Sequence, residues 1–161
     1  MANELPSTFN LEAFQQATFE GEQGDTRYAP PIEAKEYLAM IKGPYNTDKA
    51  TRLRQEKGYL ILDVVYEVDD PEQLQKLGFT KLPSVRQSIF LDLTEQGGLD
   101  MGPYKNGELN RLREAIGMNV PGQRWGFADF VGKPVRVKVG HRADKDRPER
   151  TYAEVREVTK A

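Results

Sequence analysis

YLILDVVYEV, residues 59–68, carries the strongest strand signal in the chain. Its Val, Ile, Leu and Tyr side chains suit the pleated surface of a sheet, where branched and aromatic groups pack well against their neighbours. The run stops at Asp69-Asp70-Pro71, a sequence typical of a turn. We therefore predict a strand over residues 59–68, in a protein that is mainly β.

Four further segments alternate polar and apolar residues, as strands do when they bury one face. They are residues 33–42, 84–94, 134–142 and 152–158. Within residues 84–94 we expect odd-numbered side chains inward and even-numbered ones outward, because successive side chains of a strand point to opposite faces. The inward set is Val85, Gln87, Ile89, Leu91 and Leu93, and the outward set is Ser84, Arg86, Ser88, Phe90 and Asp92.

A helix is predicted over residues 106–118, between the third and fourth strands. Apolar side chains recur there at helical spacing, Asn106 is a suitable N-cap and Gly117 follows the last turn. A briefer helix is expected over residues 71–79. Trp125, the only tryptophan, is expected to pack against the longer helix rather than to stack on a base.

The predicted order of elements, three strands, a helix and two strands, is that of the OB-fold, a five-stranded barrel. We assign residues 31–161 to this domain. Residues 1–30 precede it as an acidic arm, with scattered phenylalanines, at most a short helix capped by Asn10, and a double proline at the end. The segment 43–58 between the first two strands is expected to be a basic loop, or a short helix inside one.

The composition removes most enzyme classes. The 161 residues include no cysteine and a single histidine, His141, which excludes disulfide frameworks, thiolate zinc sites and multi-histidine metal sites. No glycine-rich loop has the spacing that cradles phosphate, and the carboxylates follow no metal-ligand pattern. We expect no enzymatic activity, no cofactor and no metal. The chain also starts without an export signal and has no apolar run long enough to span a bilayer.

Charge is divided unevenly along the chain, although the formal net charge is only −2. Acids dominate before residue 41, and bases dominate after residue 131. A sequence pI near 5.6 is low for a protein that binds nucleic acid. The asymmetry nevertheless predicts a localised cationic surface, because distribution matters more than the sum.

Bases and aromatics fall on the parts of an OB barrel that bind ligands, which are the outer face of strands two and three and the two long loops. A single nucleic-acid strand is held by cations along its phosphates and by rings under its bases, so both must share one groove. The predicted nucleic-acid-binding residues are Tyr45, Lys49, Arg52, Arg54, Lys57, Tyr59, Arg86, Phe90, Arg136, Lys138, Arg142, Lys145, Arg147 and Arg150.

Simpler roles exist for some of these side chains. Tyr59 and Phe90 can be core residues, because an aromatic at strand spacing is more often core than platform. Arg136 and Lys138 can merely solvate an outer face. The convergence of both residue types in one fold favours the binding interpretation.

Five segments form a specific pattern of turns and strands, namely PIEAKEYLAMIKG, GYLILDVVYEV, LNRLREAIGM, FADFVGKPVRVKVGHR and TYAEVREV. Over roughly residues 31–158 this pattern resembles a family of phage-encoded OB-fold proteins that are similar to single-stranded-DNA-binding proteins. The resemblance implies sequence-tolerant binding of single-stranded DNA in phage replication or recombination, without a cofactor. It also implies the cytoplasm of the infected bacterium as location, with phage or host replication and recombination proteins as candidate partners.

A second hypothesis is a phage structural or protein-interaction module on the same barrel, docking through its acidic, phenylalanine-bearing arm. Fold alone does not decide between the two. A continuous positive groove across strands two and three would favour nucleic acid. A mixed surface with an exposed apolar patch would favour a protein partner.

Overall fold

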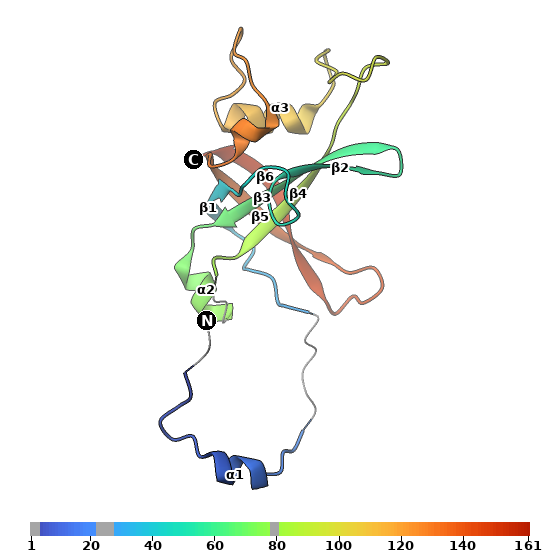
Figure 1. Cartoon of the computed structure of the whole chain (residues 1–161). Helices are drawn as coiled ribbons and strands as arrows, with labels where there is room; N and C mark the ends of the chain where they lie inside the picture. Colours follow the sequence, from blue (N-terminus) through green and yellow to red (C-terminus); the bar gives the residue numbers. More distant parts are fainter. Residues whose placement is uncertain (1–3, 22–27, 78–80) are drawn as a thin grey trace.

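The computed structural model describes residues 4–21, 28–77 and 81–161. Within these ranges, six strands pair into one antiparallel sheet and three short α-helices accompany it (Figure 1). In chain order the elements are α1 (Leu11–Gln16), β1 (Glu36–Ile41), β2 (Arg52–Glu56), β3 (Tyr59–Val68), α2 (Pro71–Leu77), β4 (Ser84–Phe90), α3 (Gly107–Ala115), the 3₁₀ turn η1 (Phe127–Phe130), β5 (Pro134–Ala143) and β6 (Thr151–Lys160).

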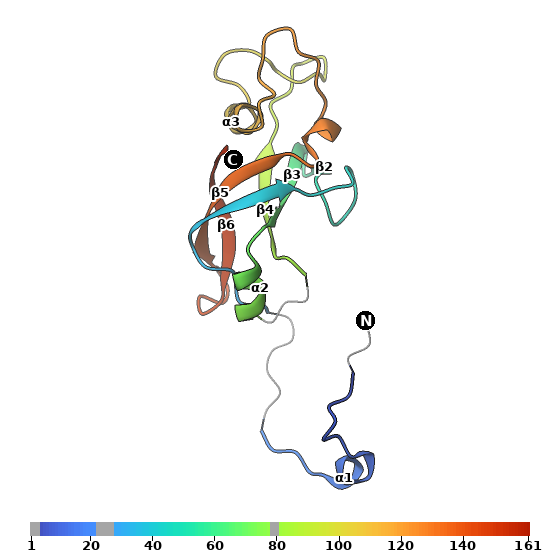
Figure 2. The ribbon, with the colours of Figure 1, turned by 90° about the vertical axis from the view of Figure 1, so that its left-hand side faces the viewer.

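Strand β3 organises the sheet. Along one edge its first half pairs with β2 and its last residues pair with β1, while β4 pairs along the other edge. β5 pairs with the free edge of β1, and β6 pairs with β5. β4 and β6 contact each other, but no hydrogen-bonded register joins them in the described part of the chain. The sheet is therefore open, and Figure 2 shows its strands crossing steeply instead of lying in a flat layer.

The core lies on one face of the sheet and follows the predicted alternation. β1 buries every second residue, as does the first half of β5, and β3 is buried along most of its length. Full burial of a Val, Leu, Ile or Phe side chain stabilises the fold by about 1.5–3 kcal/mol. The side chains that the three strands give to the core are Tyr37, Ala39, Ile41, Leu62, Val64, Tyr66, Val68, Val135, Val137 and Val139.

The predicted faces of β4 are confirmed where the strand is formed. Val85 and Ile89 are buried, and Phe90 is exposed on the opposite face. The predicted end of the strand was wrong, because the strand ends at Phe90 instead of continuing to residue 94, although Leu91 is buried as predicted. Leu93 is consequently exposed, although alternation had placed it in the core.

The predicted loop over residues 43–58 contains a strand, β2, so the sheet has six strands and not five. Lys57 and Gly58 form a two-residue hairpin turn between β2 and β3, and both have positive φ, 50° and 81°. Such turns match the twist of the strands they join. The sequence RLRQE hides the strand, because it has no β-branched residue and its charges suggest a loop.

Helix α3 covers one end of the sheet with Leu109 and Leu112 buried, as predicted. Asn106 precedes it, but its side chain does not cap the helix. Its amide nitrogen donates instead to the carbonyl oxygens of Asp92 and Asp100, each at 2.9 Å, and its amide oxygen accepts from the Asp92 N–H at 2.7 Å. Asn106 therefore holds the predicted N-cap position through its backbone, whose carbonyl accepts from the Asn110 N–H at 2.9 Å, while its side chain closes the loop after β4.

Trp125 packs against α3, as predicted. The Arg113 guanidinium of that helix lies 4.0 Å from the centre of the Trp125 ring. Trp125 also contacts two phenylalanines. It stacks on Phe130 with ring centres 5.8 Å apart, and it meets Phe127 edge-on. The tryptophan is therefore part of a packed aromatic cluster at the end of the sheet.

The N-terminal arm contains α1, which buries none of its residues. Asn10 caps this helix as predicted, accepting from the Ala13 N–H at 3.0 Å. Tyr28 fastens the end of the arm to β6, since its hydroxyl donates to the Thr151 carbonyl and accepts from the Thr151 N–H. The predicted end of the brief helix over residues 71–79 lies outside the described residues. No helix in the described ranges is both long and apolar enough to cross a membrane.

Candidate nucleic-acid interface

The outer face of β2, β3 and β4 is arranged in cross-strand rows. One row contains Arg54, Ile61 and Phe90 side by side, and the next contains Arg52, Asp63 and Ser88. We call this surface the β2–β3–β4 face. It brings together five of the predicted nucleic-acid-binding residues, which are Arg52, Arg54, Tyr59, Arg86 and Phe90.

Two aromatic rings lie exposed at one end of this face. Tyr59 begins β3 and Phe90 ends β4, and each side chain is 60% exposed. Their ring centres are 5.5 Å apart with the planes at 84°, an edge-to-face pair. Ile61 is buried beside Phe90 in the same row, so the exposed pair is not needed to fill the core. The rings offer flat apolar surface to a ligand.

Asp63 lies at the centre of the face and is only 1% exposed. Its carboxylate accepts from Arg54 Nε at 2.5 Å and from the Ser88 hydroxyl at 2.7 Å. Burial by itself would raise the pKa of Asp63, but the two hydrogen bonds, together with the positive charges of Arg54 and Arg86, outweigh burial and the pKa is lowered. The same hydrogen bond to Asp63 raises the pKa of Arg54. Asp63 is thus a buried carboxylate that stays ionised and fixes the position of the Arg54 guanidinium on this face.

Only part of the positive charge on the face is available to a ligand. Arg54 also pairs with Glu56, and Arg52 pairs with Asp48. Arg86 is exposed, and within the described residues no carboxylate lies at ion-pair distance from it. Arg86 is therefore the cation on this face best placed to contact a phosphate.

The loop before β2 is folded, not open. Thr51 is buried and its backbone N–H donates to the Lys42 carbonyl at 3.1 Å. Tyr45 is half-buried there, and burial raises its pKa. Lys49 in this loop and Lys57 at the hairpin turn are exposed. The two lysines lie at opposite ends of β2, and Lys57 is at the end that carries Tyr59 and Phe90. The ring of Tyr45 is less accessible than that of Tyr59.

Arg136 and Lys138 lie exposed on the outer side of β5, as predicted. β1 separates them from β3 and thus from the β2–β3–β4 face. Lys138 faces carboxylates on both sides, Glu36 of β1 and Glu157 of β6. These two bases belong to a second, more mixed surface.

Four predicted bases belong to the hairpin between β5 and β6. Arg142 lies over the Tyr152 ring with 5.8 Å to its centre, and Arg150 lies over the Tyr28 ring with 5.4 Å. Lys145 and Arg147 are exposed in the turn. The hairpin thus combines cations with aromatic rings, and one of those rings comes from the N-terminal arm.

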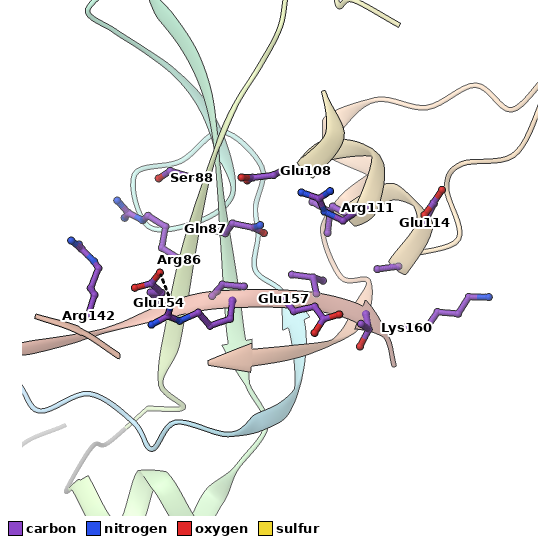
Figure 3. Close-up of a pocket in the computed structure, with 16 residues that line it drawn as sticks. Arg86, Gln87, Ser88, Glu108, Arg111, Glu114, Arg142, Glu154, Glu157 and Lys160 are labelled. Atoms are coloured by element: carbon purple, nitrogen blue, oxygen red, sulfur yellow. Dashed lines mark ion pairs between the residues drawn. The ribbon is translucent and has the colours of Figure 1, made fainter. Parts of the chain in front are cut away.

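A cleft of about 780 Å³ lies between β4, β6 and α3 (Figure 3). We call it the β4–β6 cleft. The close-up shows Arg86 and Arg142 on one side of it and Arg111 of α3 on the other. The structure therefore brings the predicted residues Arg86 and Arg142, from separate strands, to one wall. Its lining comprises Arg86, Gln87 and Ser88 of β4, Arg142 of β5, residues 154–160 of β6, and Glu108, Arg111, Leu112, Glu114 and Ala115 of α3.

Arg111 was missed among the candidate residues. It follows Glu108 by three positions and precedes Ala115 by four, so all three lie on one flank of α3. A helical projection from the sequence shows this flank, but only the tertiary structure places it opposite β4 and β6. Arg156, also missed, lies across Gly140, where a Cβ atom would be 2.3 Å from the arginine Nε.

No group of three or more His, Cys, Asp or Glu side chains suited to a metal ion occurs in residues 4–21, 28–77 and 81–161. His141, the only histidine, has Nε2 at 2.6 Å from the Ile32 carbonyl oxygen. This contact ties the residues after the arm to β5.

No family model matches the chain, and no curated protein matches it in sequence.

Proposed function

We propose that the chain is a sequence-tolerant single-stranded DNA-binding protein that acts in phage DNA replication or recombination, without catalysis. The observation that carries the proposal is the exposed pair of Tyr59 and Phe90 on a face whose other exposed side chains are polar and include Arg86. Unpaired bases stack on such rings, and each stacked base is worth about 1–3 kcal/mol. Every base has an aromatic face, so binding of this kind tolerates any sequence.

The order of the strands supports an OB-type barrel as the scaffold. When β2 is treated as an extension of the first loop, β1, β3, β4, β5 and β6 take the places of the five OB strands. α3 then falls between the third and the fourth. β4 and β6 become the third and fifth strands, and they adjoin without pairing, as in a partly open barrel. The β2–β3–β4 face is the outer face of strands two and three, where OB-folds bind oligonucleotides.

The charge distribution supports single strands over duplex. The formal net charge is −2, and several bases of the face are already paired with carboxylates. Generic attraction to the dense phosphate array of duplex DNA is therefore small. Stacking, in contrast, requires unpaired bases.

The test is fluorescence anisotropy with labelled oligonucleotides of one length, as single-stranded DNA, duplex DNA and single-stranded RNA, at one salt concentration. We expect single-stranded DNA to bind at least about tenfold tighter than duplex, the equivalent of one stacked base or less. Arg86→Ala should weaken binding to single strands, whereas Arg124→Ala, which removes an exposed arginine remote from the face, should not. Equal affinity for duplex and single strand would refute the proposal.

A further inference from the structure

The N-terminal arm exposes a row of aromatic rings that lie against one another. Phe9 and Phe14 have ring centres 5.7 Å apart, and Phe14 and Phe19 have centres 5.5 Å apart. Phe14 is 54% exposed, Phe19 is 74% exposed and Leu11 is 61% exposed. Contiguous apolar surface of this kind marks an interaction site more often than ordinary surface.

The part of the arm that carries the phenylalanines, residues 4–21, has charged side chains of one sign only. Residues 4–21 contain Glu4, Glu12 and Glu20 and no lysine or arginine. A surface that binds this arm should therefore combine apolar area for the rings with unpaired cations for the carboxylates.

The β4–β6 cleft supplies the apolar part of such a surface. Its lining includes Leu112 and Ala115 of α3 together with Val155 and Val158 of β6. These two valines are only half-buried, although the valines of the neighbouring strand β5 are buried. The core side of β6 is thus incompletely covered where it borders the cleft. The volume of 780 Å³ lies within the range of about 300–1,000 Å³ found for binding pockets.

The cleft also supplies unpaired cations. Arg86 and Arg111 face it from opposite sides, and in the described part of the chain neither has a carboxylate at ion-pair distance (Figure 3). Two of the acids that line it are already engaged. Glu154 pairs with Arg156 at 3.7 Å, and Glu114 accepts from the side-chain amide of Asn119 at 3.4 Å. The lining as a whole holds five bases, Arg86, Arg111, Arg142, Arg156 and Lys160, and four acids, Glu108, Glu114, Glu154 and Glu157. Its charge is therefore mixed with a small excess of bases, and Arg86 and Arg111 are the two that can meet an acidic segment from opposite sides.

We propose that the β4–β6 cleft binds the N-terminal arm of a second copy of this chain, with phenylalanines on the apolar floor and glutamates at Arg86 and Arg111. Tyr28 anchors the arm at the start of β6, and Figures 1 and 2 both show α1 on the opposite side of the sheet from α3. In these views α1 lies away from the cleft of its own chain, so we assign the cleft to the arm of another copy.

This contact is heterologous, because an arm of one copy meets a cleft of the next. Interfaces of that type continue from copy to copy into a ring or an open filament, unless two copies exchange arms reciprocally and close into a dimer. The inference goes beyond the proposed function, and the assembly requires no nucleic acid.

The test is sedimentation velocity of the full-length protein without nucleic acid, over a series of concentrations. We expect the wild type to form dimers and larger species as its concentration rises. The arm variant, Phe14→Ala with Phe19→Ala, and the cleft variant, Arg111→Glu, should each associate at least about tenfold more weakly, as hot-spot substitutions do. The altered phenylalanines are exposed and Arg111 lies on the surface of α3, so circular dichroism should show an unchanged fold.

A mixture of the two variants gives the sharpest outcome. The intact arm of the cleft variant can enter the intact cleft of the arm variant, so equimolar mixing should produce a heterodimer and no larger species. Tyr104→Ala and Arg124→Glu, which alter an exposed aromatic and an exposed base elsewhere, should associate like the wild type. A wild type that stays monomeric, or a mixture that fails to associate, would overturn the proposal. Loss of DNA binding alone would leave it intact.

Discussion

Phe90 is an apolar residue on a polar strand face. Its neighbours on that face include Arg86 and Ser88, whereas Ile89 on the other side is fully buried. We expect Phe90→Ala to reduce single-strand affinity by about 1–3 kcal/mol, the value of one stacked base. Its free energy of unfolding should fall by less than the roughly 3–5 kcal/mol that truncation of a buried phenylalanine costs.

Ile89→Ala is the matched control, since it should reduce stability by about 2–5 kcal/mol and leave the affinity of the folded fraction unchanged. Denaturant midpoints and anisotropy on the same preparations measure both quantities. If Phe90→Ala behaves like Ile89→Ala, the ring supports the fold and not the ligand.

Asp63 links the β2–β3–β4 face to pH. Its pKa in the folded protein is lowered from the ordinary 3.8, so the folded state prefers the carboxylate more than the unfolded state does. Its contribution to stability is therefore complete above the unfolded pKa and disappears as the pH falls through the folded pKa. We expect Asp63→Asn to lower the free energy of unfolding by roughly 1–3 kcal/mol at neutral pH, because Arg54 loses a charged partner.

The measurement is the urea midpoint at neutral pH and at steps below about pH 4, near the unfolded pKa of aspartate. The Asp63→Asn protein should lose less stability between these conditions than the wild type does. Asp48→Asn is the control, because Asp48 is exposed and its pairing with Arg52 should be worth about 1 kcal/mol or less. An unchanged acid slope in Asp63→Asn would place the pH dependence in other carboxylates.

At the scale of elements, β2 supplies the arginines that make the outer side of β3 a candidate site. Its pairing with β3 places Arg54 beside Ile61 and lets the guanidinium reach Asp63. Without this strand the buried outward side chains of β3 would face solvent. The hairpin formed by β2 and β3 therefore builds the face as well as extending the sheet.

Strand β5 carries a separate test of electrostatic binding. Arg136→Ala combined with Lys138→Ala should weaken single-strand binding equally for all sequences. It should also flatten the salt dependence by about 0.7 logarithmic units for each phosphate that the variant no longer neutralises. The control is Lys105→Ala with Arg124→Ala, which removes two exposed bases outside β5.

Affinity measured over a range of salt concentrations gives the slope for each variant. Lys138 stands between Glu36 and Glu157 and should contribute less than Arg136, whose neighbours in the register are Leu38 and Thr159. A folded double variant with the wild-type slope would mean that these side chains only solvate the outer face.

At the scale of the whole molecule, Tyr28 connects the arm to the sheet. Tyr28 exchanges two hydrogen bonds with Thr151 and meets the Tyr152 ring edge-on. We expect removal of residues 1–30 to leave a cooperatively unfolding domain that is less stable by about 1–3 kcal/mol, because two hydrogen bonds of roughly 0.5–1.5 kcal/mol each are removed.

Tyr28→Phe in the full-length chain should reproduce most of that loss, since it removes the same hydroxyl group. Thermal or urea unfolding followed by circular dichroism compares the two proteins. Absence of a cooperative transition in the shortened chain would make the arm part of the core.

Local patterns in the sequence determined the strands over residues 59–68 and 134–142, the two faces of residues 84–90, the cap at Asn10 and the burial of Leu109 and Leu112. Each of these depends on the alternation of apolar side chains or on a neighbour a few residues away. The physical driving force, burial of one side of an element, leaves a periodic trace in the chain. The mainly β class could be predicted for the same reason.

The tertiary structure alone decided the rest. RLRQE becomes a strand because β3 offers it an edge. The side chain of Asn106 bonds back to Asp92 instead of capping α3, and Arg54 bonds to a buried carboxylate. Arg86, Arg111 and Arg142 meet at one cleft although they come from three different elements. Each of these outcomes depends on a partner that is distant or unspecified in the sequence. Strand pairing and ion pairing produce no periodic pattern of residues along the chain. Some residues of the candidate site could therefore be predicted from the sequence, but their arrangement in space could not.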